Sequence, residues 1–507
     1  MSSMKIGWAE VDITPDKKIA LAGQFAERIS EYVEKPLTAT AMAVECGDDQ
    51  MVLVSFDLSS IGDNLLAAIR ENLGDRAPGL DPDKLMLAAI HTHTGPVYSR
   101  REKIAPYYEK TGTSSQGSRA LMQAMLPPGR KYVESAPISN SDEIAKPKEV
   151  LALLVERGTD VVIEAWNSRK EGSFTNAFGR APIGMCRRAT YSDGSAQMWG
   201  DTNTAVFDAV EGGNDSGIEL MYVFDGQKKL TGVVVNLACP AQCVQHRLFV
   251  SPDFWGETKK LLREHFGEDL FMLPLCSAAG DQCPVDLVRW VEPYTDVHDP
   301  NITRKNPLRR KADPSMFDLD GMKKAGRRIA NEVIGVYEEG LDEPQTDIVF
   351  EHRVRMLQLP LRRATLADVA NARRAIREFF EEHPGDVNYD DTAKLQVYLG
   401  ILKRFQLQEL LDIFEVESHI IRMGSIAIAT NPFELFLDYG NQIKARAKCE
   451  QTFLIQLCNG AGGYLPTEKA EKGGHYSAFI ASGKVGHAGG EQLVRETLRE
   501  INSLFAD

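Results

Sequence analysis

The sequence predicts an α/β fold in which a mixed central β-sheet is flanked by helices and interrupted by long loop insertions. Three observations support this prediction: short apolar runs of strand length, helical patterns between them, and a composition typical of globular proteins. The chain has 507 residues, of which 43% are hydrophobic, 26% charged and 8% aromatic. A chain of this size can bury a substantial core, and we expect one large domain over residues 1 to 507.

The predicted strands are apolar runs that are each followed directly by a loop rich in small and polar residues. Their short lengths and β-branched content favour buried strands over helices. Because ligands of α/β sheets usually bind beyond the strand ends, we expect the polar loops to gather in one site. The runs are MVLVSFDLS (51 to 59), KLMLAAIHTHTGP (84 to 96), LTGVVVNLACPAQ (230 to 242), DLFMLPLCSAAGDQ (269 to 282), SIAIATNPFE (425 to 434) and TFLIQLCNGAGGY (452 to 464).

Helical patterns separate these runs, and several have one charged face. They cover residues 64 to 73, 255 to 266, 320 to 339, 366 to 382, 393 to 413 and 490 to 505. The stretch from about 364 to 415 is a candidate helical insertion or small subdomain. Residues 97 to 149 are typical of an irregular insertion, and residues 290 to 318 of a long loop over the core.

Charge and hydropathy exclude several classes of protein. The 72 acidic and 58 basic residues give a net charge of -14, which argues against a nucleic-acid partner. The N-terminus has no signal-peptide pattern and no run of about 18 apolar residues occurs, so we expect a cytoplasmic protein without a membrane span. Neither a P-loop nor a strand-anchored GxGxxG is present, so a nucleotide cofactor is not indicated. The eight cysteines are expected to be reduced.

His91 and His93 are the first candidates for chemistry. They follow a predicted strand two residues apart, so in extended structure their side chains project on one face. Neutral imidazole is a good zinc ligand. Two solvent-facing loop histidines would be the structural alternative, but the turn Thr94-Gly95-Pro96 that follows would hold the pair rigidly.

Several segments, in order along most of the chain, resemble the catalytic domain of the neutral ceramidase family. AAIHTHTGP is similar to its HTHSGP segment, and GWAEVDITP to its N-terminal strand. The other matching segments are IGMCRRATYSDG, AAGDQCPVD, ATNPFELF and GAGGYLPT. Residues 465 to 507 leave no room for the immunoglobulin-like domain that follows the catalytic part in ceramidases, so the resemblance is to a divergent member.

The resemblance implies a zinc site and its surroundings. His91 would be the first ligand, with Glu434 and Tyr464 completing the set, and His93 would polarise substrate or water. Arg187 would lie near the substrate, and Asp281 would orient a histidine or the attacking water. Taken singly, each residue also has a structural explanation: Glu434 could start a helix and Tyr464 could be a core aromatic.

Two departures from the family pattern matter. The second histidine ligand of the family aligns with Pro240, which cannot bind zinc, and we expect His246 to replace it, with Cys239, Gln242 and Cys243 also within reach. Cys283 stands where the family has serine. A thiol nucleophile is one interpretation, and a packing or hydrogen-bonding role is the favoured one because zinc-bound hydroxide already supplies a nucleophile.

The predicted function is that of a zinc-dependent hydrolase, of amidohydrolase or esterase type, that cleaves an amide or ester bond in a polar small-molecule or glycan-derived substrate. Two alternatives stay open. One is a carbohydrate-active zinc esterase or lyase, because the same metal stabilises an enolate as well as an oxyanion. The other is a binding protein that has lost a metal ligand. A homo-oligomer is also left open.

Overall fold

The computed structural model describes residues 4–110, 122–133, 141–289 and 316–506, and its core consists of two β-sheets packed face to face. The larger sheet has eight strands in the order β14-β12-β11-β6-β1-β3-β4-β5. Their bounds are β1 (Lys5–Asp12), β3 (Thr38–Cys46), β4 (Asp49–Phe56), β5 (Leu85–Ala89), β6 (Lys170–Arg180), β11 (Gly217–Asp225), β12 (Leu230–Leu237) and β14 (Phe271–Cys276).

The smaller sheet comes from the C-terminal part of the chain. It has the order β16-β17-β18-β20, with bounds Phe350–Pro360, Ile413–Met423, Ile426–Thr430 and Gln451–Ile455. Side chains alternate between its two faces, as expected for strands buried on both sides. Ile426, Ile428 and Phe453 point into the core shared with the large sheet, whereas Ala427 and Leu454 point the other way.

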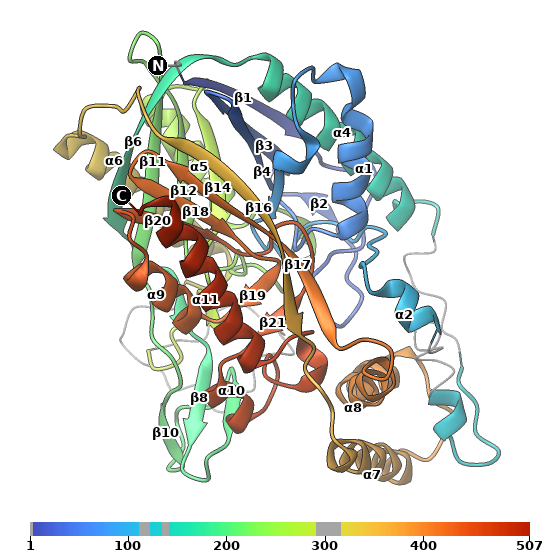
Figure 1. Cartoon of the computed structure of the whole chain (residues 1–507). Helices are drawn as coiled ribbons and strands as arrows, with labels where there is room; N and C mark the ends of the chain where they lie inside the picture. The colour runs from blue at the N-terminus through green and yellow to red at the C-terminus, as the bar shows by residue number, and fades with distance from the viewer. Residues whose placement is uncertain (1–3, 111–121, 134–140, 290–315, 507) are drawn as a thin grey trace.

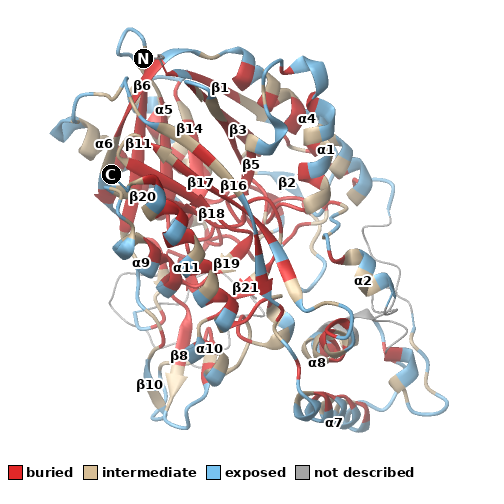
Figure 2. Ribbon diagram, viewed as in Figure 1, coloured by how far each residue is buried: buried red, intermediate tan, exposed pale blue. Residues whose placement is uncertain are grey.

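Helices cover the outer faces of both sheets and complete four layers (Figure 1). On the large sheet lie α1 (Asp63–Leu73), α4 (Pro147–Asn167), α5 (Phe254–Phe266) and α6 (Asp318–Glu339). On the small sheet lie α9 (Leu437–Arg446) and α11 (His487–Leu504). Figure 2 shows buried residues concentrated in the strands and exposed residues on the outer sides of these helices. The predicted α/β class is therefore confirmed.

All six predicted strands are present, and three pairs among them are parallel: β4 with β5, β12 with β14, and β18 with β20. The carboxyl ends of each pair therefore point the same way, which brings the polar loops to common edges.

Several short strands outside the two main sheets also pair with each other. The pairs are β2 (Tyr32–Val33) with β13 (Phe249–Val250), β7 (Met185–Cys186) with β15 (Gln282–Cys283), and β19 (Phe433–Leu435) with β21 (Gly463–Leu465). In a small three-stranded sheet, β8 (Arg188–Tyr191) pairs with both β10 (Phe207–Val210) and β9 (Ala196–Met198).

Two helices between β16 and β17 form a hairpin with a small apolar core of its own (Figure 1). They are α7 (Leu366–Glu382), which begins with a Thr365–Asp368 capping box, and α8 (Tyr389–Leu407). The prediction of a helix over 393 to 413 was wrong at its end, because residues from Ile413 onward pair with β16.

Of the predicted insertion at 97 to 149, the described part includes the short helix α2 (Ala105–Lys110). The loop predicted at 290 to 318 lies almost wholly outside the described residues. None of the described helices is long and apolar enough to cross a membrane.

Candidate active site

A cavity of about 530 Å³ lies where the loops after β5, β18 and β20 meet. Its walls include four of the residues singled out in the sequence: His91, His93, Glu434 and Tyr464. The first two come from the large sheet, whereas the last two follow strands of the small sheet. The connection between the sheets is direct, because the Leu457 carbonyl accepts a hydrogen bond from the Ala89 amide at 3.3 Å.

His91 is held in one orientation by backbone contacts on both of its sides. It follows β5 with a φ of 65°, a left-handed conformation that is uncommon outside glycine and often marks functional sites. Its amide donates to the Leu58 carbonyl at 2.9 Å, and its Nδ1 donates to the Ser59 carbonyl at 2.6 Å. Since a carbonyl only accepts, Nδ1 carries the proton and the lone pair of Nε2 is free to face the cavity.

The Nε2 atom of His91 faces two further polar side chains. Oε2 of Glu434 lies 3.4 Å away, and Nε2 of His93 lies 3.3 Å away. Burial raises the pKa of the Glu434 carboxyl, but the neighbouring His91, Arg187 and Tyr464 outweigh burial and hold that pKa below its usual value. Glu434 is therefore an anion beside the His91 ring.

His93 is packed against glycine and fixed by amides. Its ring lies over Gly23, its Nε2 accepts from the Gln242 amide nitrogen at 2.9 Å, and its carbonyl accepts from Arg28 at 2.6 Å. Burial, followed by the neighbouring His91 ring and two arginines, lowers the pKa of His93 well below 6.5. The ring is consequently neutral at pH 7 and able to accept a proton or a hydrogen bond at Nε2.

Glu434 and Tyr464 are direct register partners in the parallel β19–β21 pair, so the backbone sets their spacing. Tyr464 is among the groups that lower the pKa of the Glu434 carboxyl. Tyr476 lines the same cavity, and its ring meets the Tyr464 ring edge-on at 5.4 Å. Burial raises the pKa of Tyr476 to about 12 and also raises the pKa of Tyr464, so both hydroxyls keep their protons near neutrality.

Arg187 connects the two halves of the site although it is 3% exposed. Its guanidinium donates to Oε1 of Gln242 at 2.9 Å, to the Gly280 carbonyl at 3.0 Å and to the Tyr464 hydroxyl at 3.3 Å. Burial disfavours the cation, but nearby acidic groups, Tyr464 first among them, raise the pKa of Arg187. A planar fork of donors suits these three acceptors in a way that lysine would not.

Asp281 and Cys283 lie behind this site. Asp281 Oδ1 accepts from the Leu437 amide at 2.9 Å at the start of α9, and its carbonyl accepts from the Arg187 amide. Burial raises the pKa of Asp281 to about 6. The Cys283 thiol is fully buried and donates to the Val285 carbonyl at 3.5 Å, and burial raises its pKa to about 12. Neither residue is among those that line the cavity.

His246 is placed elsewhere, among residues that do not line the cavity. Its ring stacks on Phe317 with centroids 4.9 Å apart, and its Nε2 lies 3.3 Å from Oδ1 of Asp318. From the same loop, the Gln242 side chain reaches His93. Within the described residues, no group of three or more His, Cys, Asp or Glu side chains forms a metal site.

Comparison with solved structures gives the fold an identity. Along 100% of its length the chain superposes on a neutral ceramidase from Pseudomonas aeruginosa, covering 76% of that chain with a TM-score of 0.64 and 15% sequence identity. This protein has the neutral ceramidase fold. A ceramidase complexed with C2 matches over the same shares of the two chains, with a TM-score of 0.64 and 13% identity.

The neutral ceramidase fold is thus confirmed as predicted, although the sequences have diverged far. No family model matches the chain, and no curated protein matches it by sequence.

Tyr476 lines the cavity but was not among the residues predicted from the sequence. The signal that could have found it is the glycine pair Gly473-Gly474 directly upstream, which resembles the turns beside the other site residues. His475 and Ser477 on either side of it both have positive φ, at 69° and 70°.

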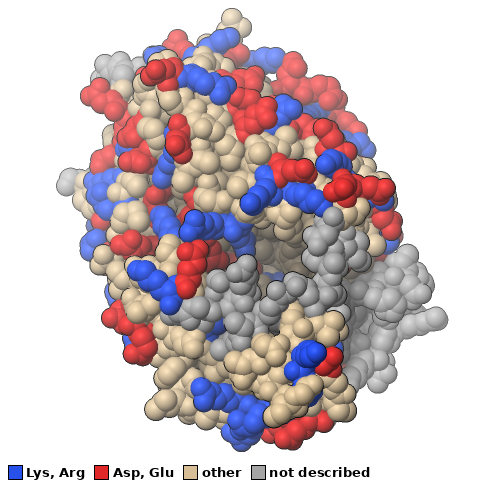
Figure 3. Space-filling model, turned by 90° about the vertical axis from the view of Figure 1, so that its right-hand side faces the viewer, with Lys and Arg blue, Asp and Glu red and all other residues tan. Residues whose placement is uncertain are grey.

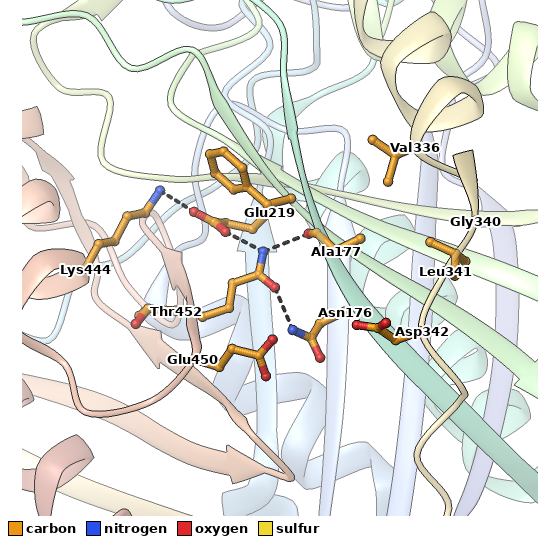
Figure 4. Close-up of a pocket in the computed structure, with 12 residues that line it drawn as sticks. Asn176, Ala177, Glu219, Val336, Gly340, Leu341, Asp342, Lys444, Glu450 and Thr452 are labelled. Carbon is orange, nitrogen blue, oxygen red and sulfur yellow. Dashed lines mark hydrogen bonds and ion pairs between the residues drawn. The ribbon is translucent and has the colours of Figure 1, made fainter. Parts of the chain in front are cut away.

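A second cavity, of about 430 Å³, lies between β6, β11 and β20 (Figure 4). Its central polar groups satisfy one another. Glu219 pairs with Lys444 Nζ at 3.0 Å and accepts from the Gln451 amide at 2.5 Å, and the same amide donates to the Ala177 carbonyl at 2.8 Å. Such a closed network fixes the sheets against each other rather than presenting groups to a ligand.

Proposed function

We propose that this protein is a metal-dependent hydrolase that cleaves an amide or ester bond in a polar small-molecule substrate, with zinc held by His91, Glu434 and Tyr464. The observation that carries the proposal is the orientation of His91. Its Nδ1–H is held by the Ser59 carbonyl while its Nε2 faces the Glu434 carboxylate at 3.4 Å. Metal-binding histidines typically have this arrangement, in which a backbone carbonyl fixes the tautomer.

The types of donor atom in this cavity are those that zinc accepts. An imidazole nitrogen, a carboxylate and a phenol oxygen converge on one cavity, and zinc accepts nitrogen and oxygen ligands. Zinc bound there would polarise a substrate carbonyl and lower the pKa of a bound water to about 7. We leave His246 out of the ligand set because it contacts Phe317 and Asp318 instead.

The surrounding side chains supply the remaining requirements of acyl transfer. Tyr476 is a protonated donor on the cavity wall, suited to an oxygen that gains negative charge. His93 is neutral and accepts at Nε2, so it can accept a hydrogen bond from an attacking water and orient it once the Gln242 contact is exchanged. Arg187 orients Tyr464 and Gln242 through its three hydrogen bonds.

An amide is the preferred bond because the structural neighbours are ceramidases, which by name act on an N-acyl lipid. A polar substrate is preferred over a lipid because the cavity wall carries Gln24, Ser59, Ser60 and Ser482 together with charged side chains. Cys283 is assigned a packing role, since a thiol with a pKa of about 12 is almost wholly protonated at pH 7.

Metal content of the purified protein tests this proposal. After expression with added zinc, the wild-type protein should carry close to one zinc per chain and hydrolyse N-acyl substrates, and both properties should be lost on chelation. His91→Ala and Glu434→Gln should bind little zinc. His265→Ala is the matched control, because its ring is far more exposed and pairs with Glu338 on α6. A metal-free wild-type protein would support the binding-protein alternative and overturn the proposal.

A further inference from the structure

Two cationic side chains line the candidate active-site cavity in addition to the residues proposed to act on the bond. Arg100 belongs to the loop that follows His91 and His93, and Lys484 to the loop that precedes α11. Both share the cavity wall with His91 and Glu434. Figure 3 shows the face of the molecule that lies to the right in Figure 1, where Lys and Arg side chains lie beside a hollow near the middle.

Arg100 is positioned but not neutralised. Its Nη1 hydrogen-bonds Oγ of Ser60, and its stem lies over Gly62, where an added Cβ would come within 2.5 Å of Arg100 Cγ. The residue is exposed, and among the described residues no carboxylate forms an ion pair with it. One edge of its guanidinium is thus fixed, and its remaining donors are available to a ligand.

Lys484 stands among other cations. Its Nζ lies 3.1 Å from Oε2 of Glu102 and 5.6 Å from the centre of the Tyr108 ring. Arg404 of α8 donates to the carbonyls of both Lys484 and Gly483, so a second buried cation lies directly behind the first. Like charges held close together repel, and an anion bound in the cavity would relieve that repulsion.

The burial of Lys484 also favours the binding of an anion in the cavity. The side chain of Lys484 is 18% exposed, so its charge is screened less than that of a surface lysine. Burial and then Lys484 lower the pKa of Lys403 on α8, whereas Glu102 and Tyr108 outweigh burial and raise the pKa of Lys484, so Lys484 stays a cation although it is largely buried. Glu102 is the acidic side chain paired with Lys484, and it also lines the cavity.

We propose that the substrate carries a carboxylate that binds between Arg100 and Lys484 while its scissile amide lies at His91 and Glu434. Resting on the proposed hydrolase function, this inference narrows the substrate to an anionic N-acyl compound of the N-acyl amino acid class. A guanidinium fork pairs with a carboxylate through two charge-assisted hydrogen bonds, and the cavity of about 530 Å³ is in the range for small-molecule sites.

A matched pair of substrates tests the inference in the zinc-loaded full-length protein. N-acylglycine and N-acylethanolamine of equal acyl length differ in a carboxylate against a neutral hydroxymethyl group. We expect kcat/KM to be about tenfold or more higher for N-acylglycine, as a charge-assisted hydrogen bond allows. Arg100→Gln and Lys484→Gln should remove most of this preference by raising KM for N-acylglycine, with the ethanolamine substrate little affected.

Glu102→Gln should change KM for N-acylglycine in the opposite direction. Removing the carboxylate that competes for Lys484 should lower KM for N-acylglycine. Lys228→Gln is the control, since Lys228 lies on an exposed turn in an ion pair with Glu343. Thermal melts identify any variant that fails to fold, and the exposed Arg100→Gln keeps the test open if Lys484→Gln does so.

The outcomes separate the two proposals. If the zinc-loaded wild type hydrolyses both substrates equally well, or if Arg100→Gln slows both alike, the carboxylate site is overturned and the hydrolase stands. If the wild type hydrolyses neither substrate at any acyl length, the hydrolase function itself is overturned. A preference for N-acylglycine that is lost in Arg100→Gln and sharpened in Glu102→Gln supports both.

Discussion

The imidazole of His93 lies directly against the backbone of Gly23, so closely that a Cβ added to Gly23 would come within 2.2 Å of His93 Cγ. Gly23 also has a φ of 91°, which side chains rarely adopt. The position of His93 in the cavity therefore depends on the absence of a side chain 70 residues earlier in the sequence, on the segment that precedes β3.

Gly23→Ala should displace His93 and lower kcat/KM by about tenfold or more, with a loss of about 1–3 kcal/mol in the free energy of unfolding. Steady-state kinetics and urea unfolding measure the two effects. Gly79→Ala is the control, because Gly79 has a φ of 82° but nothing within 4 Å of its added Cβ. It should lose stability through backbone strain alone, and equal activity in the two variants would contradict the prediction.

Arg187→Lys should reduce kcat/KM by about 100-fold, a magnitude typical of removing a preorganised donor. Lysine cannot reach Gln242, the Gly280 carbonyl and the Tyr464 hydroxyl together, as the guanidinium does. Zinc content measured alongside should change little, because Arg187 is not a proposed ligand. A variant that lost zinc but kept its residual rate per bound metal would show that Arg187 serves the ligands rather than the reaction.

Cys283→Ala should keep activity within about twofold of wild type and cost about 1 kcal/mol of stability, as expected for loss of a small buried group. The thiol is buried and its pKa is about 12, so iodoacetamide should not inactivate the folded enzyme. Activity that survives chelation but disappears in Cys283→Ala would instead establish a thiol nucleophile.

His246→Ala should retain the zinc content of the wild type and lose stability. The substitution removes the stack on Phe317 and the contact with Asp318, which keeps its ion pair with Arg247. Metal analysis and a thermal melt, run beside His91→Ala, distinguish a structural role from ligation. Loss of zinc in both variants would restore the sequence-based assignment of His246 as a ligand.

A buried histidine pair between the sheets should contribute a loss of stability as the pH drops below about 6.5. Nε2 of His352 lies 2.8 Å from Nδ1 of His419, whose Nε2 lies 3.0 Å from Glu417. Burial lowers the pKa of both histidines, so the unfolded chain binds more protons than the folded protein once the pH is below 6.5. Each histidine contributes up to about 1.4 kcal/mol of lost stability per pH unit in that range.

Urea unfolding at pH 8 and at several values down to 5 measures this dependence. His352→Gln should reduce the slope of unfolding free energy against pH relative to wild type, because one histidine with a lowered pKa is gone. An unchanged slope in that variant would place the pH dependence elsewhere in the protein.

The strands and their polar loops could be predicted because each strand is buried on both faces and ends in residues that favour loops. Because paired strands run in the same direction, the loops after them lie close together. This places His91, His93, Glu434 and Tyr464 in one cavity. The division of the core into two sheets could not be predicted, since apolar runs carry no information on which strands pair.

The position of His246 could not be predicted from the sequence. Sequence distance suggested that a histidine in the loop after β12 could replace the missing ligand, but the stack of His246 on Phe317 depends on a residue far along the chain. Gln242, four residues earlier, reaches His93 because the Ala241 amide donates to the Ile90 carbonyl and fixes the loop beside β5. Contacts of this kind are set by tertiary structure, and residue spacing does not reveal them.

The two sheets each supply one half of the cavity, and this has a consequence for how the protein matures. His91 and His93 come from the N-terminal sheet, whereas Glu434 and Tyr464 reach the site only after the C-terminal sheet has docked on it. Contacts between segments so distant in sequence form slowly, after local structure. During refolding, recovery of activity should therefore lag behind recovery of secondary structure, which makes enzymatic turnover a reporter of sheet docking.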